Sequence, residues 1–299
     1  MLYIGEFYSL LTACLWSGSS IAFTAAARRI GSVQVNISRL IMAAGYLIVL
    51  VLLCRLDLTL STMQIVYLSI SGFIGFTLGD TFLFKAFKLI GARISMLIMS
   101  LAPAVAAFLA YIILGENLSL WGVVGIIVTL TGIAIVILGM SGGTTNGSVV
   151  HHVARGGIVL AILGAVGQGG GLIFAKMAFL EGSINGFVAT LIRILASLVV
   201  LLPVSIISGR YKNPVQVFRN DPSAFKYTVL GSIFGPFLGV TSSLMAIQYT
   251  KVGIAATIMA TTPIVMLPLV RFVQKEHLSW RAIAGAFIAT LGVALLFLP

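Results

Sequence analysis

Two charged residues of opposite sign stand inside apolar stretches of the chain. Arg39 falls about a third of the way along the segment 33–54, and Asp80 about two thirds of the way along 62–87. If both segments are membrane helices that run in opposite directions, the two side chains lie in the same half of the membrane. An ion pair would offset the cost that lipid imposes on each charge. The residues predict such a pair, either as a gate that opens or as a static contact.

Other polar residues in the apolar stretches are candidates to line a cavity, because lipid offers them no hydrogen-bond partners. Trp16 could stack on a flat substrate, although packing is the alternative role. The glycines around Gln168, in GQGGG, could weaken a helix and bare its carbonyl groups, or could let helices pack closely. The candidates are Trp16, Ser19, Ser20, Arg39, Asp80, Gln168, Lys176, Arg193, Thr241, Ser242 and Thr261, with Ser17, Ser243 and Thr262 as neutral neighbours.

The sequence does not indicate the active site of an enzyme. The histidines are His151, His152 and His277, which we expect in loops and not in a metal-binding cluster. There is no His-Glu-x-x-His or phosphate-binding loop motif. We therefore expect no catalytic residue, no metal and no cofactor, so that any energy comes from gradients or from the substrate itself.

The composition points to a membrane protein. The 299 residues are 60% hydrophobic and 8% charged, whereas a soluble domain carries about 25% charged residues. Apolar segments long enough to cross a hydrocarbon core of ~30 Å recur along the chain. We predict an all-α polytopic membrane protein with ten helices at about 3–27, 33–54, 62–87, 92–114, 119–139, 156–180, 184–208, 224–249, 254–272 and 279–298.

Pro103 and Pro263 fall near the middle of the predicted helices 92–114 and 254–272. A proline there removes a backbone donor and clashes with the carbonyl group four residues back, so each helix is expected to kink. Kinked helices around a cavity can flare at one end and close at the other. The two prolines are therefore hinge candidates, and packing kinks are the alternative.

The chain repeats itself. Residues 100–132 align with 260–292 without a gap at a shift of 160, and Arg39 aligns with Arg193 at a shift of 154, whereas Asp80 aligns with Val240. We predict a first repeat at 1–139, a linker at 140–155 rich in Gly, Ser and Thr, and a second repeat at 156–299. The pairs of the 160 shift include Pro103 with Pro263, Glu116 with Glu276, Gly125 with Gly285 and Gly132 with Gly292; we expect both acids to cap the helix that follows.

Five crossings in each repeat place the second repeat upside down relative to the first. Inverted repeats of this kind are typical of secondary transporters, in which two similar halves surround a central cavity. Basic residues favour the cytoplasm, so the odd-numbered loops should be cytoplasmic and both termini outside. These loops hold thirteen of the eighteen basic residues: Arg28, Arg29, Lys85, Lys88, Arg93, Arg155, Arg210, Lys212, Arg219, Lys226, Arg271, Lys275 and Arg281.

The segments SLAPAVAAFLAYIILGENLS and GVVGIIVTLTGIAIV resemble the Pro…Gly-Glu…Gly…Gly pattern of the EamA family in the drug/metabolite transporter superfamily. GDTFLFKAFKLIGARIS, just upstream, is similar to the stretch that precedes this pattern. The second copy departs from it, since QKEHLS keeps Glu276 and lacks the glycine. The resemblance implies ten helices around a central cavity and the transport of small metabolites. It also implies cytoplasmic termini. The charge distribution favours termini outside the cell, and we follow the charge distribution.

We therefore expect a secondary active transporter of the inner (plasma) membrane that exports small polar metabolites, amino acids above all, by alternating access. Its partners are a small-molecule substrate, the lipid bilayer and protons as a candidate coupling ion, with no nucleic acid, in a monomer or weak dimer. One alternative is a proton antiporter for cationic drugs of the small multidrug resistance type. That chemistry needs a carboxylate deep in the first helix, and Glu6 stands only at its mouth. An integral membrane enzyme is the third class.

Overall fold

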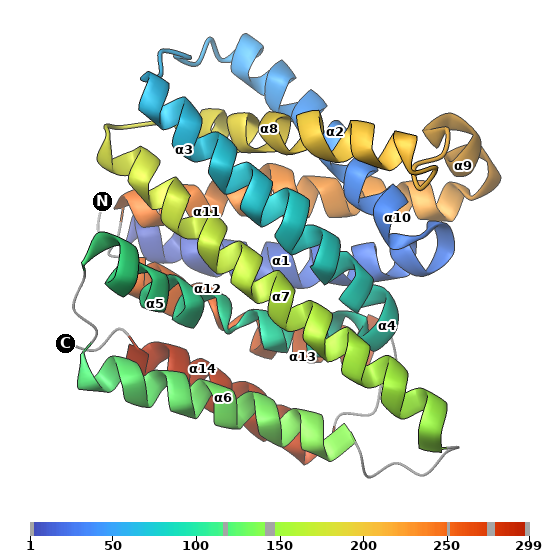
Figure 1. Cartoon of the computed structure of the whole chain (residues 1–299), viewed down its shortest axis with the longest axis vertical. Coiled ribbons are helices and arrows are strands. Elements are labelled where there is room, and N and C mark those ends of the chain that lie inside the picture. The colour runs from blue at the N-terminus through green and yellow to red at the C-terminus, as the bar shows by residue number, and fades with distance from the viewer. Residues whose placement is uncertain (1–2, 116–118, 141–146, 250–251, 274–278, 297–299) are drawn as a thin grey trace.

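The computed structural model describes residues 3–115, 119–140, 147–249, 252–273 and 279–296, and within these ranges the chain is all-helical (Figure 1). The acids Glu116 and Glu276 and the histidine His277 lie outside the described residues. The elements are α1 (Ile4–Ile30), α2 (Ser32–Leu53), α3 (Thr62–Gly72), η1 (Phe73–Gly79), α4 (Asp80–Met99), α5 (Ala102–Leu114), α6 (Leu120–Met140), α7 (Gly147–Leu180), α8 (Gly186–Ile207), α9 (Pro214–Asn220), α10 (Pro222–Ser232), η2 (Ile233–Phe237), α11 (Leu238–Tyr249), α12 (Val252–Met259), α13 (Thr262–Val273) and α14 (Trp280–Leu296).

Five of the described helices are each long and apolar enough to cross a membrane. They are Ile4–Ile30, Ser32–Leu53, Arg155–Leu180, Gly186–Ile207 and Pro222–Tyr249, and counting Thr62–Met99 with Ala102–Ile113 as one bent span gives six. Large apolar side chains such as Leu53, Val199 and Phe287 are exposed on the outer helix faces. The chain is thus a helical polytopic membrane protein whose outer surface suits lipid.

Several predicted helices are interrupted. In α4, Gly91 has a φ of 77° and ψ of 170°, outside the helical region, so the turn expected between 62–87 and 92–114 is made by one glycine, which tolerates positive φ. Ser100 and Leu101 separate α4 from α5, and Ala260 and Thr261 separate α12 from α13. The expected linker at 140–155 is also partly helical, because α6 continues to Met140 and α7 begins at Gly147 and includes His151 and His152, which we expected in a loop.

The two segments of π-helix, η1 and η2, lie at corresponding places in the two halves. Phe73 begins η1 and Ile233 begins η2, a separation of 160 residues, which is the shift of the sequence repeat. A π-helix is rare and is found most often at functional sites, because it widens the helix locally and rotates the side chains that follow it. The sequence alone gave no signal for either segment.

Glycine contacts show that α6 and α14 pack against each other reciprocally. A methyl group placed on Gly132 would come within 2.4 Å of the backbone nitrogen of Ala289, and one on Gly292 within 2.3 Å of that of Thr129. The two contacts are equivalent under the repeat, because Gly132 corresponds to Gly292 and Thr129 to Ala289 at the shift of 160 residues. Since residue numbers rise along one helix as they fall along the other, the helices are antiparallel, side by side at the bottom of Figure 1. Gly132 and Gly292 therefore let the two helices pack closely.

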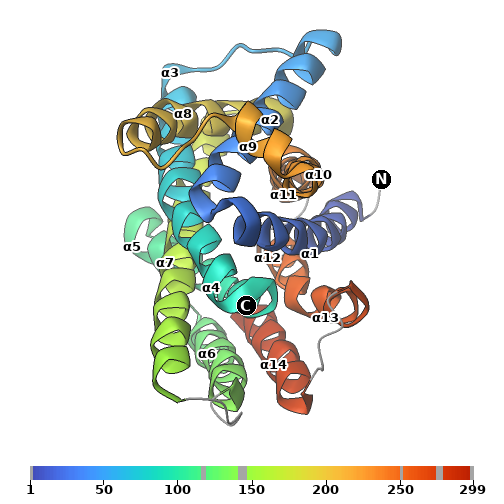
Figure 2. The same ribbon diagram turned by 90° about the vertical axis from the view of Figure 1, so that its right-hand side faces the viewer.

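In Figure 2 the helices surround the middle of the molecule, with α3 and α7 on one side and α1, α11 and α13 on the other. Glycines allow α7 to approach the first half closely, because a methyl group on Gly167 would lie 2.5 Å from the Cα of Gly79, and one on Gly169 2.7 Å from the carbonyl oxygen of Ala102. The helix α7 is continuous through GQGGG. Close packing, and not an unwound helix, therefore explains these glycines.

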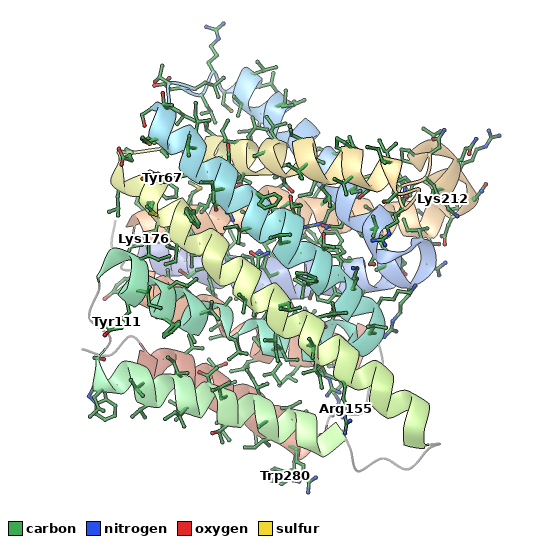
Figure 3. The ribbon with its side chains drawn as sticks, in the orientation of Figure 1. Tyr67, Tyr111, Arg155, Lys176, Lys212 and Trp280 are labelled. Atoms are coloured by element: carbon green, nitrogen blue, oxygen red, sulfur yellow. The ribbon has the colours of Figure 1, made fainter. Side chains whose placement is uncertain are left out.

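Loops that are odd-numbered in the predicted topology meet at one end of the molecule. Arg29 forms an ion pair with Asp221 at 3.3 Å, and Gln34 exchanges two hydrogen bonds with the backbone of Lys212, at 3.1 and 2.9 Å. At the other end, the side chain of Gln64 donates to the carbonyl of Gly182 at 3.4 Å. Figure 3 shows the two ends, with Arg155 and Lys212 to the right and Tyr67, Tyr111 and Lys176 to the left.

Candidate functional site

A cavity of about 200 Å³ lies between the two halves of the chain. Its wall combines residues of α1, α2, η1, α4 and α5 with residues of α7, α8, η2, α11, α12 and α13. Most of the lining is apolar. The charged and polar residues among the described lining are Trp16, Ser19, Ser20, Arg39, Asp80, Ser100, Gln168, Arg193, Ser243 and Thr262.

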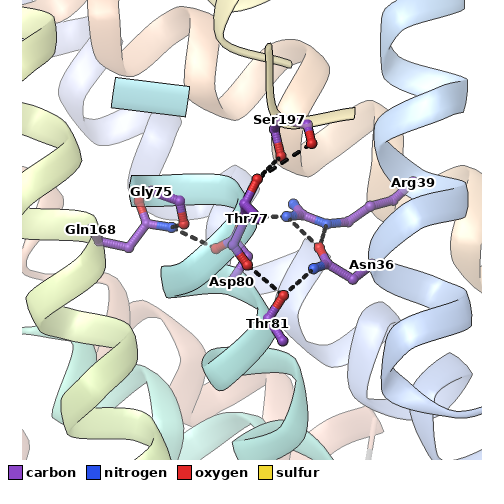
Figure 4. A network of polar contacts seen from close by, with 8 residues as sticks. All are labelled: Asn36, Arg39, Gly75, Thr77, Asp80, Thr81, Gln168 and Ser197. Carbon is purple, nitrogen blue, oxygen red and sulfur yellow. Dashed lines mark hydrogen bonds and ion pairs between the residues drawn. The ribbon is translucent and has the colours of Figure 1, made fainter. Parts of the chain in front are cut away.

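The predicted ion pair between Arg39 and Asp80 is present at the wall of this cavity (Figure 4). The Nη2 atom of Arg39 donates to the Oδ2 atom of Asp80, and the residues are 5% and 4% exposed. Arg39 comes from α2 and Asp80 is the first residue of α4, directly after the π-helical turn. Two helices of the first repeat are therefore joined by a charge pair that is buried from solvent.

Neutral side chains complete the hydrogen bonding of the pair. The Nε2 atom of Gln168 donates to Oδ1 of Asp80 at 2.5 Å and to the carbonyl of Gly75 at 3.3 Å. On the other side, the Oδ1 atom of Asn36 accepts from Nε and Nη2 of Arg39 at 3.1 and 3.0 Å. Both carboxylate oxygens of Asp80 thus have donors, one from each half of the chain. Paired charges with satisfied hydrogen bonds are the form in which buried ions are tolerated.

Aromatic rings surround the guanidinium group of Arg39. Its Cζ atom lies 4.5 Å from the ring centroid of Phe84 and 5.3 Å from that of Phe23. Such cation–π contacts stabilise a desolvated cation. They also hold the side chain between α1 and α4, so that the ion pair has a fixed place in the wall.

Arg193 of α8 reaches the same cavity without a carboxylate of its own. It is 5% exposed, its Cζ atom lies 4.7 Å from the centroid of Phe76 in η1, and its Nε atom is buried without a hydrogen-bond partner. No carboxylate among the described residues lies within ion-pairing distance of it. The two arginines that align between the repeats thus both face the cavity, and within the part of the chain that the structure describes Arg39 is the one in direct ion-pairing contact with a carboxylate.

The cavity residues of each helix follow a helical spacing. On α1 they are Trp16, Ser19, Ser20 and Phe23, and on the part of α4 before Gly91 they are Asp80, Leu83, Phe84 and Phe87. Both sets have the pattern i, i+3, i+4, i+7, which defines one helix face. Sequence reasoning missed Phe84 and Phe87, although their spacing from Asp80 could have identified them.

Four predicted cavity residues do not line the cavity, namely Lys176, Thr241, Ser242 and Thr261. Thr241 donates to the carbonyl of Phe237 at 2.6 Å and contacts Thr190 at 3.4 Å, so it faces α8. Val240 and Ser243 line the wall, and Ser242 does not. A helix turns about 100° per residue, so the side chain of Ser242 points away from the face that Val240 and Ser243 share. Thr261 donates to the carbonyl of Ile258 at 2.7 Å within the break, and Lys176 lies two turns beyond Gln168 along α7.

Pro103 and Pro263 both line the cavity, at the breaks described above. Each is the second residue of its helix, Pro103 in α5 and Pro263 in α13. The expected mid-helix kink is thus an interruption followed by a new helix start. Proline suits a first turn, because its missing N–H would have no partner inside the helix there.

Comparisons with known proteins agree with this architecture. The EamA-like transporter family matches residues 3–138 and 155–298. An uncharacterized transporter of Archaeoglobus fulgidus is 23% identical over 97% of each chain. A protein of known crystal structure has the same fold, with a TM-score of 0.69 and 17% identity over 98% of this chain and 96% of the other. The chain belongs to the EamA-like transporter family and is a membrane transporter without enzymatic chemistry.

Proposed function

We propose that the protein is a secondary active transporter of the plasma membrane. It moves small polar metabolites by alternating access in the direction of export, with amino acids and related compounds as the substrate class. The observation that carries this proposal is the cavity that both halves line, with the Arg39–Asp80 pair and Arg193 in its wall.

Ten crossings account for the helices if the interruptions are included. The non-helical break at Gly91 divides Thr62–Met99 between a third and a fourth crossing, and the fourth continues through α5. The segments α12 and α13 together make a ninth crossing of the same kind. With α6 and α14, these join the other five apolar spans to give five crossings in each half.

The contacts between the halves support an inverted repeat. Antiparallel packing of α6 on α14 through the same glycines, shifted by 160 residues, is what a two-fold axis in the membrane plane produces. The breaks before Pro103 and Pro263 and the segments η1 and η2 repeat with the same shift. Each half thus carries the same flexible points around one cavity, which suits a rocking motion.

The size of the cavity favours small substrates. A cavity of ~150 Å³ in a protein core holds a benzene molecule, so about 200 Å³ accommodates a compound with the size of an amino acid. Bulky drugs need more room than this, and a cationic drug needs a free carboxylate. The carboxylate among the described lining residues, Asp80, is already paired, which weighs against the multidrug antiporter.

Transport in proteoliposomes tests the proposal. Purified protein would be reconstituted, and the uptake of a panel of radiolabelled amino acids and nucleosides measured with and without a pH gradient. We expect saturable uptake of at least one amino acid or related metabolite above that of protein-free vesicles. Uptake confined to large cationic drugs would favour the antiporter, and no uptake of any small metabolite would contradict the proposal.

A further inference from the structure

The two repeats differ at the position of one acid. In the first repeat, Arg39 is neutralised by Asp80. In the second repeat, Arg193 aligns with Arg39, and the residue that aligns with Asp80 is Val240. Both Arg193 and Val240 line the cavity. The second repeat therefore keeps the cation and lacks the anion that would balance it.

Arg193 is held in place as a preorganised donor. The backbone of α8 at Arg193 packs directly against α3, because a methyl group on Gly72 would lie 2.1 Å from the carbonyl oxygen of Arg193. The guanidinium group passes beside Gly75, whose missing Cβ would lie 3.4 Å from Nη2, and over the ring of Phe76. In the π-helical turn, Gly75 thus leaves room for the guanidinium group and Phe76 covers one of its faces.

A lone guanidinium in this place is expensive. Arg193 is 5% exposed and its buried Nε atom has no hydrogen-bond partner. The charged residues among the described lining are Arg39, Asp80 and Arg193, so the two guanidinium groups share the field of one carboxylate and the wall keeps one excess positive charge. A buried charge without a partner is strongly unfavourable, and a bound anion with two acceptor oxygens would relieve it through a bidentate contact.

We propose that Arg193 binds the anionic group of the substrate, and that the substrate is an apolar monoanion such as a small monocarboxylate. This inference rests on the proposed transport function and, among amino acids and related compounds, selects carboxylates with an apolar body. The carboxylate occupies the role in the second repeat that Asp80 has in the first. The apolar body lies against the phenylalanine and methionine side chains that line the rest of the cavity, among them Phe76, Met99 and Met259.

An ammonium group finds no free carboxylate among the described lining residues. The oxygens of Asp80 are taken by Arg39 and Gln168, and no other carboxylate stands among the described lining residues. A zwitterionic amino acid therefore binds through its carboxylate and gains no ion pair from its amine. A carboxylate of the same shape without the amine binds at least as well, and the corresponding amine does not bind.

Isothermal titration of the purified protein with four compounds of one shape tests this inference. The compounds are 4-methylpentanoate, 4-methylpentanamide, leucine and isopentylamine. We expect 4-methylpentanoate to bind at least as tightly as leucine and at least about tenfold more tightly than the amide, because the contact of a charged group with arginine is lost in the amide. Equal binding of acid and amide, or preferential binding of isopentylamine, would overturn the inference without any variant being made.

Variants at Arg193 locate the contact. Arg193→Gln should lower the affinity for 4-methylpentanoate by at least about tenfold and leave that for the amide unchanged. Arg193→Lys should restore part of the affinity for the acid, and Arg210→Gln, at an exposed arginine beyond α8, should change nothing. The inference is contradicted if Arg193→Gln still binds 4-methylpentanoate with full affinity. If that variant does not fold, the inference is contradicted when Arg193→Lys binds the acid no more tightly than the amide.

The outcomes separate the inference from the transport proposal. Binding of the acid that depends on Arg193, together with no uptake in proteoliposomes, would retain the site and reject the transport mechanism. Uptake of a cationic or neutral metabolite that is insensitive to Arg193→Gln would retain transport and reject the anion site.

Discussion

Asp80 is the residue on which the polar contacts of the cavity converge. It accepts from Arg39 of its own repeat and from Gln168 of the other, so it joins the two halves as well as two helices of one half. Removing one member of a buried pair leaves the other charge unpaired, which costs more than removing both. The pair is therefore tested by comparing single and double changes.

We predict strong coupling between Arg39→Gln and Asp80→Asn. Each single change should lower the free energy of unfolding by about 3–5 kcal/mol, and the double variant should lose less than the sum, by roughly 0.5–3 kcal/mol. Unfolding by denaturing detergent in mixed micelles measures this. The matched control is Arg29→Gln with Asp221→Asn, an ion pair whose side chains are 48% and 26% exposed, where little coupling is expected. Additive effects at Arg39 and Asp80 would contradict an energetic role for their contact.

Exchange of the two charges tests the pair in transport. Both single changes should abolish most uptake, and the variant with Asp at 39 and Arg at 80 should recover some of it, since the side-chain amides of Asn36 and Gln168 can rotate to serve either sign of charge. No recovery would show that the orientation of the pair matters, as it does if Asp80 carries protons. Loss of pH dependence in Asp80→Asn would then be the decisive measurement.

Depth along a helix could be predicted from the sequence at this scale, but rotation about the helix axis could not. The relative depths of Arg39 and Asp80 predicted their ion pair. Thr241, Ser242 and Ser243 are three consecutive polar residues. Ser243 lines the cavity because it lies on the same helix face as Val240, and the sequence does not show which face points inward. The contact of Gln168 with Asp80 joins different repeats, and nothing local in either segment indicates it.

At the scale of elements, the helix interruptions repeat between the halves. The breaks before α5 and α13 and the π-helical turns η1 and η2 recur with a shift of 160 residues. Windows of hydropathy predicted ten apolar segments, whereas five of the described helices, or six with the bent pair, are each long and apolar enough to cross a membrane. Hydropathy continues through the interruptions, because composition changes little across a break. Such windows could not predict the interruptions themselves, which depend on single backbone conformations such as that of Gly91.

We predict that Pro103→Ala and Pro263→Ala each slow transport and leave substrate affinity nearly unchanged. Alanine supplies the missing N–H and favours a continuous helix across the break, so the two ends would no longer bend independently. The measurement is the maximal rate of uptake in proteoliposomes beside the affinity from titration. The control is Pro203→Ala, near the C-terminal end of α8 on an exposed face away from the cavity, which should keep the full rate. Unchanged rates in both hinge variants would leave the prolines with a packing role.

At the scale of the whole molecule, the grouping of the loops is consistent with the charge distribution. The contacts of Arg29 with Asp221 and of Gln34 with Lys212 join loops of the two halves at one end. The rings of Tyr8 and Tyr249 stack at the opposite end, with centroids 6.2 Å apart. Most basic residues belong to the first end. Which end faces the cytoplasm was predicted from this excess of Lys and Arg and stays a prediction, because packing is the same in either orientation.

We predict that the end with Arg29 and Lys212 is cytoplasmic, since basic loops are retained on that side during insertion. Cys14 and Cys54 are both free and exposed and would first be replaced by Ser. In that background, a cysteine at Lys212 should resist a membrane-impermeant maleimide in intact cells and react after the cells are opened. A cysteine at Ser183, an exposed position in the turn between α7 and α8 at the other end, should react in intact cells. The reverse pattern would invert the orientation and place both termini in the cytoplasm. The antiparallel packing of α6 on α14 would be unaffected, because it depends only on contacts within the chain.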